Sequence, residues 1–187
     1  MATTASGLLT LPVSERDHIQ GPLDAPVTLV EYGDYECPYC GQAYYVLQAL
    51  EQQMGDLLCF VFRNFPLTSV HPHAERAAEA AEAAGAQGKF WEMYDMLYEN
   101  QQALDDTDLL QYAAALGLDL DRFNRDMAEH RYAARIREDF MSGVRSGVNG
   151  TPTFFINGTR YNGAYDLESL AEALIEAAGV ETVEDEA

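Results

Sequence analysis

Residues 35–42 read YECPYCGQ and hold two of the three cysteines of the chain, Cys37 and Cys40. Such a pair can be a redox centre, half of a zinc site or two core residues. Pro38 suits the first position of a helix, where its missing N–H costs nothing, so Cys37 is predicted at a helix mouth. The helix dipole and unpaired backbone N–H groups favour a thiolate there, which makes Cys37 the expected nucleophile.

Cys40 lies one helical turn later, on an apolar stripe with Ala43 and Leu47, so it is predicted to point into the core. The pair is therefore expected to be asymmetric. Cys37 would be exposed and attack, whereas Cys40 would be buried and resolve the mixed disulfide. An odd, small number of cysteines does not suit the disulfide framework of a secreted protein, and a close pair in a reducing compartment is more often catalytic or metal-binding.

The segments around the pair predict a βαβ unit. Residues 27–32 (VTLVEY) read as a buried strand, residues 38–54 as an amphipathic helix that ends at Gly55, and residues 57–62 (LLCFVF) as a second buried strand. The crossover between two such strands is right-handed.

The pattern then becomes helical. Helices are expected at residues 73–86, 90–98, 107–116, 121–129 and 132–144. Strand signals return at residues 153–156 and 159–161, where the Asn157-Gly158 turn between them is typical of a hairpin. Asp166 is expected to cap a last amphipathic helix.

We therefore predict one compact α/β unit in four segments. Residues 1–66 hold an N-terminal arm and the βαβ unit, residues 67–149 a helical insertion, residues 150–178 a ββα unit, and residues 179–187 an acidic tail expected to be disordered.

Glu31 shares a face of the predicted strand with Val27 and Leu29. Its carboxyl group is therefore predicted to be buried, with a raised pKa that lets it take a proton from Cys40. The alternative is a glutamate at the strand end that reaches water. Pro152 stands at the entry to a later strand, where the sequence alone leaves its peptide bond cis or trans.

Composition excludes several functions. The chain has 11 basic and 31 acidic residues, a formal net charge of −20, so nucleic acid and anionic membrane surfaces are not expected partners. No segment has the apolar length of a membrane span, and the amino terminus as given carries no secretory signal. A cytoplasmic location is the expectation.

Together the motifs resemble the DsbA-like thiol:disulfide oxidoreductases, a thioredoxin-like fold with a helical insertion. The resemblance runs from about residue 13 to residue 174. Four stretches carry it: residues 24–40 (DAPVTLVEYGDYECPYC), FPL at 65–67 with HPHA at 71–74, residues 87–101 (QGKFWEMYDMLYENQ), and residues 147–158 (GVNGTPTFFING).

The resemblance implies that Cys37 and Cys40 form a redox-active disulfide and that Glu31 is the buried acid six positions before Cys37. It also implies that Pro152 is a cis-proline facing the disulfide. The backbone of Thr151 would then pair with a substrate peptide as an added strand.

The dipeptide between the cysteines, Pro38 and Tyr39, is assigned to the same substrate-binding surface. Pro-Tyr is the glutaredoxin dipeptide, whereas strongly oxidising periplasmic DsbA enzymes carry Pro-His. The missing histidine removes one contributor to thiolate stabilisation.

Other candidate residues have structural interpretations. Cys59 lies in an apolar strand and is expected to be a core residue. His71 and His73 precede a helix, where a role at the helix start is favoured over zinc binding with the cysteine pair, so no metal site is assigned. Phe90, Trp91, Tyr94 and Tyr98 fall at helical spacing and are expected to pack in the core.

We thus expect an enzyme without a cofactor that exchanges disulfides with protein or peptide thiols. A cellular thiol such as glutathione or thioredoxin would be its redox partner. Two alternatives stay open: a glutathione-linked thiol oxidoreductase, and a binding module that uses the cysteine pair as a zinc knuckle or redox-gated contact.

Overall fold

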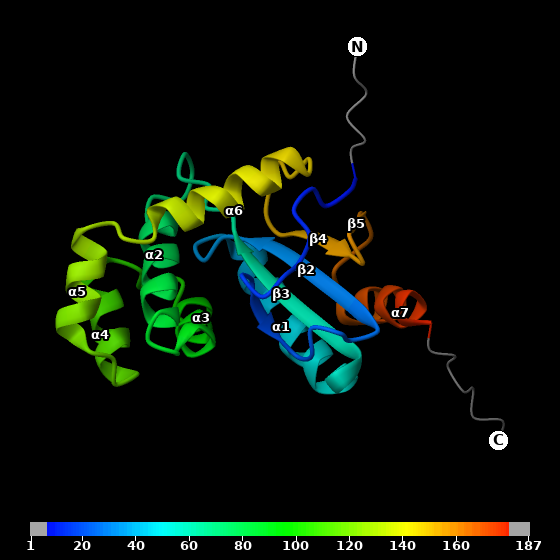
Figure 1. Cartoon of the computed structure of the whole chain (residues 1–187), viewed down its shortest axis with the longest axis horizontal. Coiled ribbons are helices and arrows are strands. Elements are labelled where there is room, and N and C mark those ends of the chain that lie inside the picture. The colour runs from blue at the N-terminus through cyan, green and yellow to red at the C-terminus, as the bar shows by residue number, and fades with distance from the viewer. Residues whose placement is uncertain (1–6, 180–187) are drawn as a thin grey trace, which may run out of the picture.

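The computed structural model describes residues 7–179 as one sheet covered by helices (Figure 1). The strands are β1 (His18–Gln20), β2 (Val27–Gly33), β3 (Leu58–Asn64), β4 (Thr153–Ile156) and β5 (Thr159–Tyr161). The helices are α1 (Pro38–Met54), α2 (Ala74–Gly85), α3 (Phe90–Glu99), α4 (Asp106–Ala115), α5 (Leu120–Ala128), α6 (Ala133–Arg145) and α7 (Leu167–Ala178), with a short 3₁₀ turn η1 (Gly55–Leu57) after α1.

The strand order is β1-β3-β2-β4-β5. β2 and β3 are parallel and are joined through α1, whereas the other three pairings are antiparallel. In this register Glu31 of β2 lies between Phe62 of β3 and Phe154 of β4. The sheet and its helices form the predicted thioredoxin-like α/β fold.

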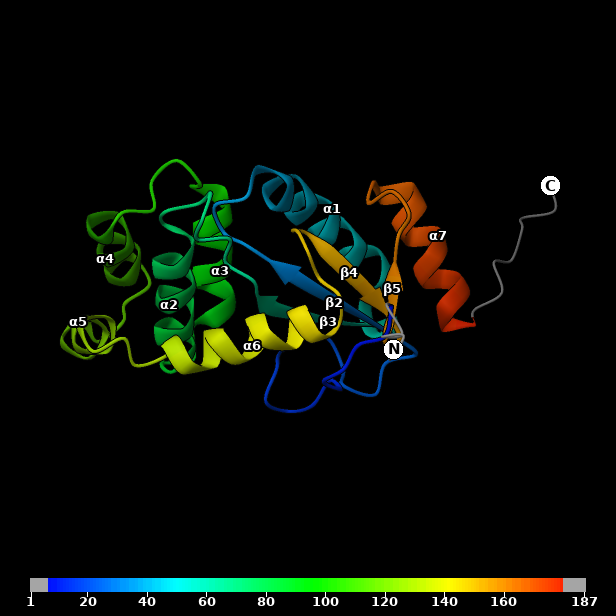
Figure 2. The same ribbon diagram turned by 90° about the horizontal axis from the view of Figure 1, so that it is seen from above.

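Alternation along β2 divides its side chains between two faces of the sheet. Val27 and Leu29 join the larger core cluster beneath α1 and α7, and Glu31 follows them on this face. Val30 and Tyr32 join a second cluster that is covered by α6 and the N-terminal segment. Figure 2 shows α1 and α7 on one side of the sheet and α6 on the other.

Helix α1 has the bounds that the sequence predicts. Pro38 occupies its first position after Cys37, and Gly55 ends it with a positive φ of 50°, a conformation that glycine adopts at little cost. Asp166 caps α7 as expected, because its side chain accepts from the backbone N–H of Ser169.

The five predicted helices between β3 and β4 are all present. In Figures 1 and 2, α2 and α3 lie beside the end of the sheet and α4 and α5 lie farthest from it. The aromatic residues of α3 enter the core as expected, and half-buried Trp91 donates from Nε1 to the carbonyl oxygen of Ile19 at 3.2 Å.

The sequence patterns missed β1. This edge strand has only three residues and no run of apolar side chains, so its antiparallel pairing with β3 defines it. The expected disorder of the acidic tail concerns residues outside the described part of the chain, apart from Gly179, which caps α7. The division into four segments stays a prediction. None of the described helices is long and apolar enough to cross a membrane.

Candidate active site

Cys37 caps the amino terminus of α1. Its backbone N–H donates to the carbonyl oxygen of Asp34 at 3.1 Å, and its Sγ donates to the carbonyl oxygen of Thr151 at 3.5 Å. Both Cys37 and Cys40 carry free thiols. The expectation that Cys37 is exposed is wrong: it is 3% exposed and Cys40 is 0% exposed, since Cys37 is packed in the core and contacted by the backbone at Thr151.

The two thiols nevertheless differ electrostatically. The pKa of Cys37 is lowered to about 5, chiefly by a hydrogen bond from Cys40, with further help from Thr151 and the backbone N–H groups of Tyr39 and Cys40 against the cost of burial. The pKa of Cys40 is raised well above its usual value by burial, by its hydrogen bond to Cys37 and by the charge of Glu31. The pair can therefore hold a thiolate on Cys37 while Cys40 keeps its proton.

Glu31 is 1% exposed, so the alternative of a strand-end carboxylate in water is wrong. Burial, and secondarily the charge of Cys37, raises the pKa of its carboxyl group to about 8. Neither carboxylate oxygen has a hydrogen-bond partner among the described residues. Such a group carries a proton at neutral pH and can exchange it with a neighbouring thiol.

The turn before β4 forms the other wall of the site. The Thr151–Pro152 peptide bond is cis, and the carbonyl oxygen of Thr151 contacts the Cys37 thiol. Pro38 and Tyr39 lie on the outside of the helix mouth, where the Tyr39 side chain is 60% exposed.

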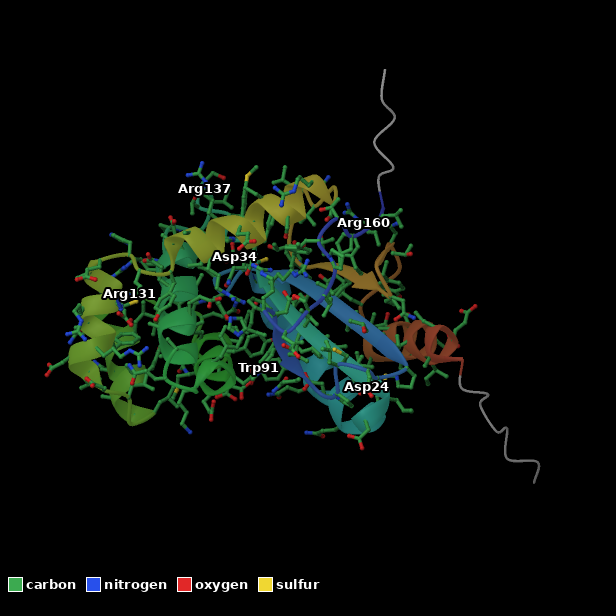
Figure 3. All side chains as sticks on the ribbon, in the orientation of Figure 1. Asp24, Asp34, Trp91, Arg131, Arg137 and Arg160 are labelled. Carbon is green, nitrogen blue, oxygen red and sulfur yellow. The ribbon has the colours of Figure 1, made fainter. Side chains whose placement is uncertain are left out.

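Asp34 organises the loop before Cys37 and was missed by the sequence analysis. Its carboxylate accepts from the backbone N–H groups of Glu36 and Leu67 at 2.8 Å and from Nδ1 of His71 at 2.8 Å. Figure 3 shows Asp34 at the end of β2, on the side of the helical block. The carboxylate thus ties the loop before Cys37 to the loop after β3.

The two histidines do reach the active-site edge of the sheet. Nδ1 of His73 pairs with Glu36 at 2.8 Å, as Nδ1 of His71 does with Asp34. Within residues 7–179, no group of three or more His, Cys, Asp or Glu side chains is arranged to hold a metal ion. Their contacts here therefore link loops, and His73 lies directly before α2.

Gln101 is a second residue that the sequence reasoning did not single out. Its Nε2 donates to the carbonyl oxygens of Tyr35 and Cys37, both at 2.9 Å. A side chain at Gly41 would collide with the Gln101 amide, so the glycine after Cys40 allows this contact. The available signal was the motif of residues 87–101, whose last residue is this glutamine.

Cys59 lies away from this site. It is fully buried on the opposite face of the sheet, in the cluster with Val30 and Val61. The prediction of a core residue is confirmed.

Comparison with known proteins shows the family to which the chain belongs. A thioredoxin family model matches residues 13–176, and the chain belongs to the thioredoxin family. Among solved structures, it resembles a thioredoxin-like oxidoreductase from Silicibacter pomeroyi (TM-score 0.78, 28% identity, 90% of this chain and 95% of that one). It also resembles BdbD from Bacillus subtilis (TM-score 0.79, 22% identity, 93% and 99% of the two chains). A third similar structure is alpha-DsbA1 from Wolbachia pipientis (TM-score 0.79, 21% identity, 91% of this chain and 94% of that one), so the expected resemblance to DsbA-like proteins is confirmed.

The relatives that are similar in sequence are named as antiporters, unlike the similar solved structures. The chain is 53% identical over 170 residues to Na(+)/H(+) antiporter NhaA 1 of Salinispora arenicola, covering 90% of this chain and 26% of the antiporter. It is 46% identical over 169 residues to NhaA 1 of a Mycobacterium species, covering 89% and 28%. The chain thus spans about a quarter of the length of these relatives.

Proposed function

We propose that the chain is a thiol:disulfide oxidoreductase that acts on protein or peptide substrates through the Cys37 and Cys40 pair. One observation carries the proposal: a thiol with a pKa near 5 caps α1 one turn from a thiol whose pKa is raised. A low pKa supplies the thiolate nucleophile, and the neighbouring thiol supplies the resolving group.

In the reducing direction, the Cys37 thiolate attacks one sulfur of a substrate disulfide. A mixed disulfide forms and the other substrate sulfur leaves as a thiolate. Once Glu31 has lost its own proton, its carboxylate takes the proton of Cys40, and Cys40 attacks the Cys37 sulfur. The second substrate thiolate leaves, and two electrons have passed from the cysteine pair to the substrate. The reverse sequence oxidises a substrate dithiol.

Thr151 is proposed to bind the substrate backbone as an added strand, with Pro152, Pro38 and Tyr39 beside it. The exposed Tyr39 ring supplies an apolar contact next to the reacting sulfur. A cellular thiol such as glutathione or thioredoxin would return electrons to the oxidised pair, and a cytoplasmic location would keep it mainly reduced.

Insulin reduction in the presence of dithiothreitol tests the proposal. The wild type should accelerate it, and Cys37→Ser should abolish the acceleration. Cys40→Ser should accumulate mixed disulfides that dithiothreitol releases. Cys59→Ser is the matched control and should behave as the wild type does. Stoichiometric zinc without turnover would instead favour a binding module, and turnover only with glutathione would favour the glutathione-linked alternative.

A second candidate function rests on the identity of 53% with an antiporter segment. We propose that a domain of this kind adjusts Na(+)/H(+) exchange through the redox state of its cysteine pair. The test replaces the matching segment of the Salinispora arenicola relative with this chain and measures exchange in vesicles after reduction or oxidation. The rate should change with redox state in the wild type and not in Cys37→Ser.

A further inference from the structure

Asp34 lies directly after β2, three residues before the nucleophile, and its buried carboxylate has a full set of hydrogen-bond donors. Oδ1 accepts from the backbone N–H of Glu36, and Oδ2 accepts from the backbone N–H of Leu67 and from Nδ1 of His71, each at 2.8 Å. A buried charge is costly unless it is hydrogen-bonded, so three donors hold this carboxylate firmly.

The backbone of Asp34 acts on both cysteines. Its carbonyl oxygen accepts from the backbone N–H of Cys37 at 3.1 Å, which closes a tight turn over residues 34–37. Burial raises the pKa of Cys40, and a hydrogen bond from the backbone N–H of Asp34 acts in the opposite direction. The position of Asp34 therefore affects the nucleophile and the resolving thiol together.

The loop after β3 is folded so that His71 reaches Asp34. The backbone N–H groups of Val70 and His71 both donate to the carbonyl oxygen of Leu67, at 3.0 and 2.9 Å. The His71 side chain is 18% exposed and that of Asp34 is 0% exposed, so their hydrogen bond is shielded from most of the solvent. A hydrogen bond to a charged group is stronger in such surroundings than in water.

A second pair of the same kind lies beside the first and offers a control. Nδ1 of His73 lies 2.8 Å from Oε1 of Glu36, and the His73 backbone N–H donates to Oε2 at 2.6 Å. This histidine side chain is 48% exposed, and within residues 7–179 the hydrogen bonds of the Glu36 carboxylate go to His73 alone. An exposed pair of this kind contributes little, and it does not hold the turn at Cys37.

The turn over residues 34–37 matters more in the dithiol than in the disulfide. Both cysteines of the described structure carry free thiols, so contacts such as the one between Asp34 and the Cys37 N–H fix the nucleophile. A disulfide has a specific geometry, and its covalent bond would hold Cys37 against α1 by itself. Losing a contact that fixes the turn should therefore destabilise the dithiol more than the disulfide.

Resting on the proposed function, we propose that Asp34 and His71 are positioning residues that set the reduction potential of the Cys37–Cys40 pair. His71 holds the Asp34 carboxylate, and Asp34 holds the turn from which Cys37 reacts. In reduction by glutathione, two glutathione thiols and the protein disulfide give two protein thiols and one glutathione disulfide. The two positioning residues shift the equilibrium constant of this exchange toward the dithiol.

His71→Ala tests this role, because it removes one donor from Asp34 and leaves both cysteines in place. Titration of the full chain with reduced and oxidised glutathione should show the equilibrium shifted about tenfold toward the disulfide, or about 30 mV. His71→Asn keeps an N–H donor near the position of Nδ1 and should return the equilibrium to within about twofold of the wild type. His73→Ala is the matched control and should also stay within about twofold.

Asp34→Asn keeps the size of the side chain and removes its charge, so it decides the question if His71→Ala does not fold. It should shift the equilibrium in the same direction. Thermal unfolding identifies the variants that stay folded, and the reduction potential is a readout that a purely structural role would not move.

An unchanged equilibrium in folded His71→Ala or Asp34→Asn, or an equal shift in His73→Ala, would overturn the positioning role. A wild type whose cysteine pair titrates with glutathione but does not reduce insulin would overturn the proposed function and leave the positioning role intact. The two failures are therefore distinguishable.

Discussion

Two ionisable side chains, Arg63 and Glu31, are buried on opposite faces of the same sheet, and they differ in their hydrogen-bond partners. Arg63 of β3 is 0% exposed, and its guanidinium donates to both carboxylate oxygens of Asp17 and to the hydroxyl of Tyr32. It also donates to the carbonyl oxygens of Leu11 and Pro12. Glu31 of β2, on the other face, has no such partner among the described residues.

This difference in pairing indicates different roles: Arg63 stabilises the fold, whereas Glu31 is suited to proton transfer. A fully paired buried charge fixes the segments that pair with it, because losing one partner leaves the other unsatisfied. Here Arg63 holds the N-terminal segment against the sheet. An unpaired carboxyl group keeps a raised pKa, which is useful only where a proton has to be taken and returned.

Breaking the buried ion pair between Arg63 and Asp17 should have the largest effect on stability. Arg63→Met leaves Asp17 buried without its cation, so we expect a loss of about 3–5 kcal/mol in the free energy of unfolding. Urea denaturation of the reduced protein at pH 7 measures it. The alkylation rate of Cys37 in the protein that stays folded should be unchanged. Arg137→Met, at an exposed position, should cost no more than about 0.5 kcal/mol.

Glu31, on the other face of the sheet, should make the stability of the protein depend on pH. In the unfolded chain Glu31 loses its proton near pH 4.5, whereas in the folded protein it keeps it to about pH 8. Between these values the unfolded state binds fewer protons, so Glu31 lowers stability as the pH rises. Glu31→Gln should match the wild type below pH 4.5 and become about 4 kcal/mol more stable by pH 8. Urea denaturation across this range would contradict the raised pKa if the two curves stayed parallel.

The same substitution should also change the rate of one step of disulfide exchange. Glu31→Gln removes the proton acceptor for Cys40, so resolution of the mixed disulfide should slow about 100-fold while its formation by Cys37 changes little. Rapid quenching of a single turnover separates the steps. Equal slowing of both would mean that Glu31 acts on Cys37 instead.

Gln101 should give the smallest effect, because its two hydrogen bonds position the loop at Cys37 without touching sulfur. Gln101→Ala should cost about 1–2 kcal/mol in the free energy of unfolding. It should also broaden the pH dependence of Cys37 alkylation, whose midpoint in the wild type should lie near pH 5. Gln53→Ala, on the exposed side of α1, is the control for both measurements.

Local patterns in the sequence were enough to predict several parts of the molecule. Helix α1 could be predicted to the residue because Pro38 begins it, Gly55 ends it and an apolar stripe runs between them. The hairpin of β4 and β5 followed from Asn157 and Gly158. The burial of Glu31 followed from alternation along one strand.

Features that depend on contacts between distant segments could not be predicted from these local patterns. The carbonyl group of Thr151 reaches Cys37 across 114 positions, and the amide of Gln101 reaches it across 64. The short strand β1 exists only through its pairing with β3. No local pattern encodes such contacts, because each depends on how the chain closes long loops around the sheet. Whether a buried charge finds a partner, as Arg63 does and Glu31 does not, is decided at that level.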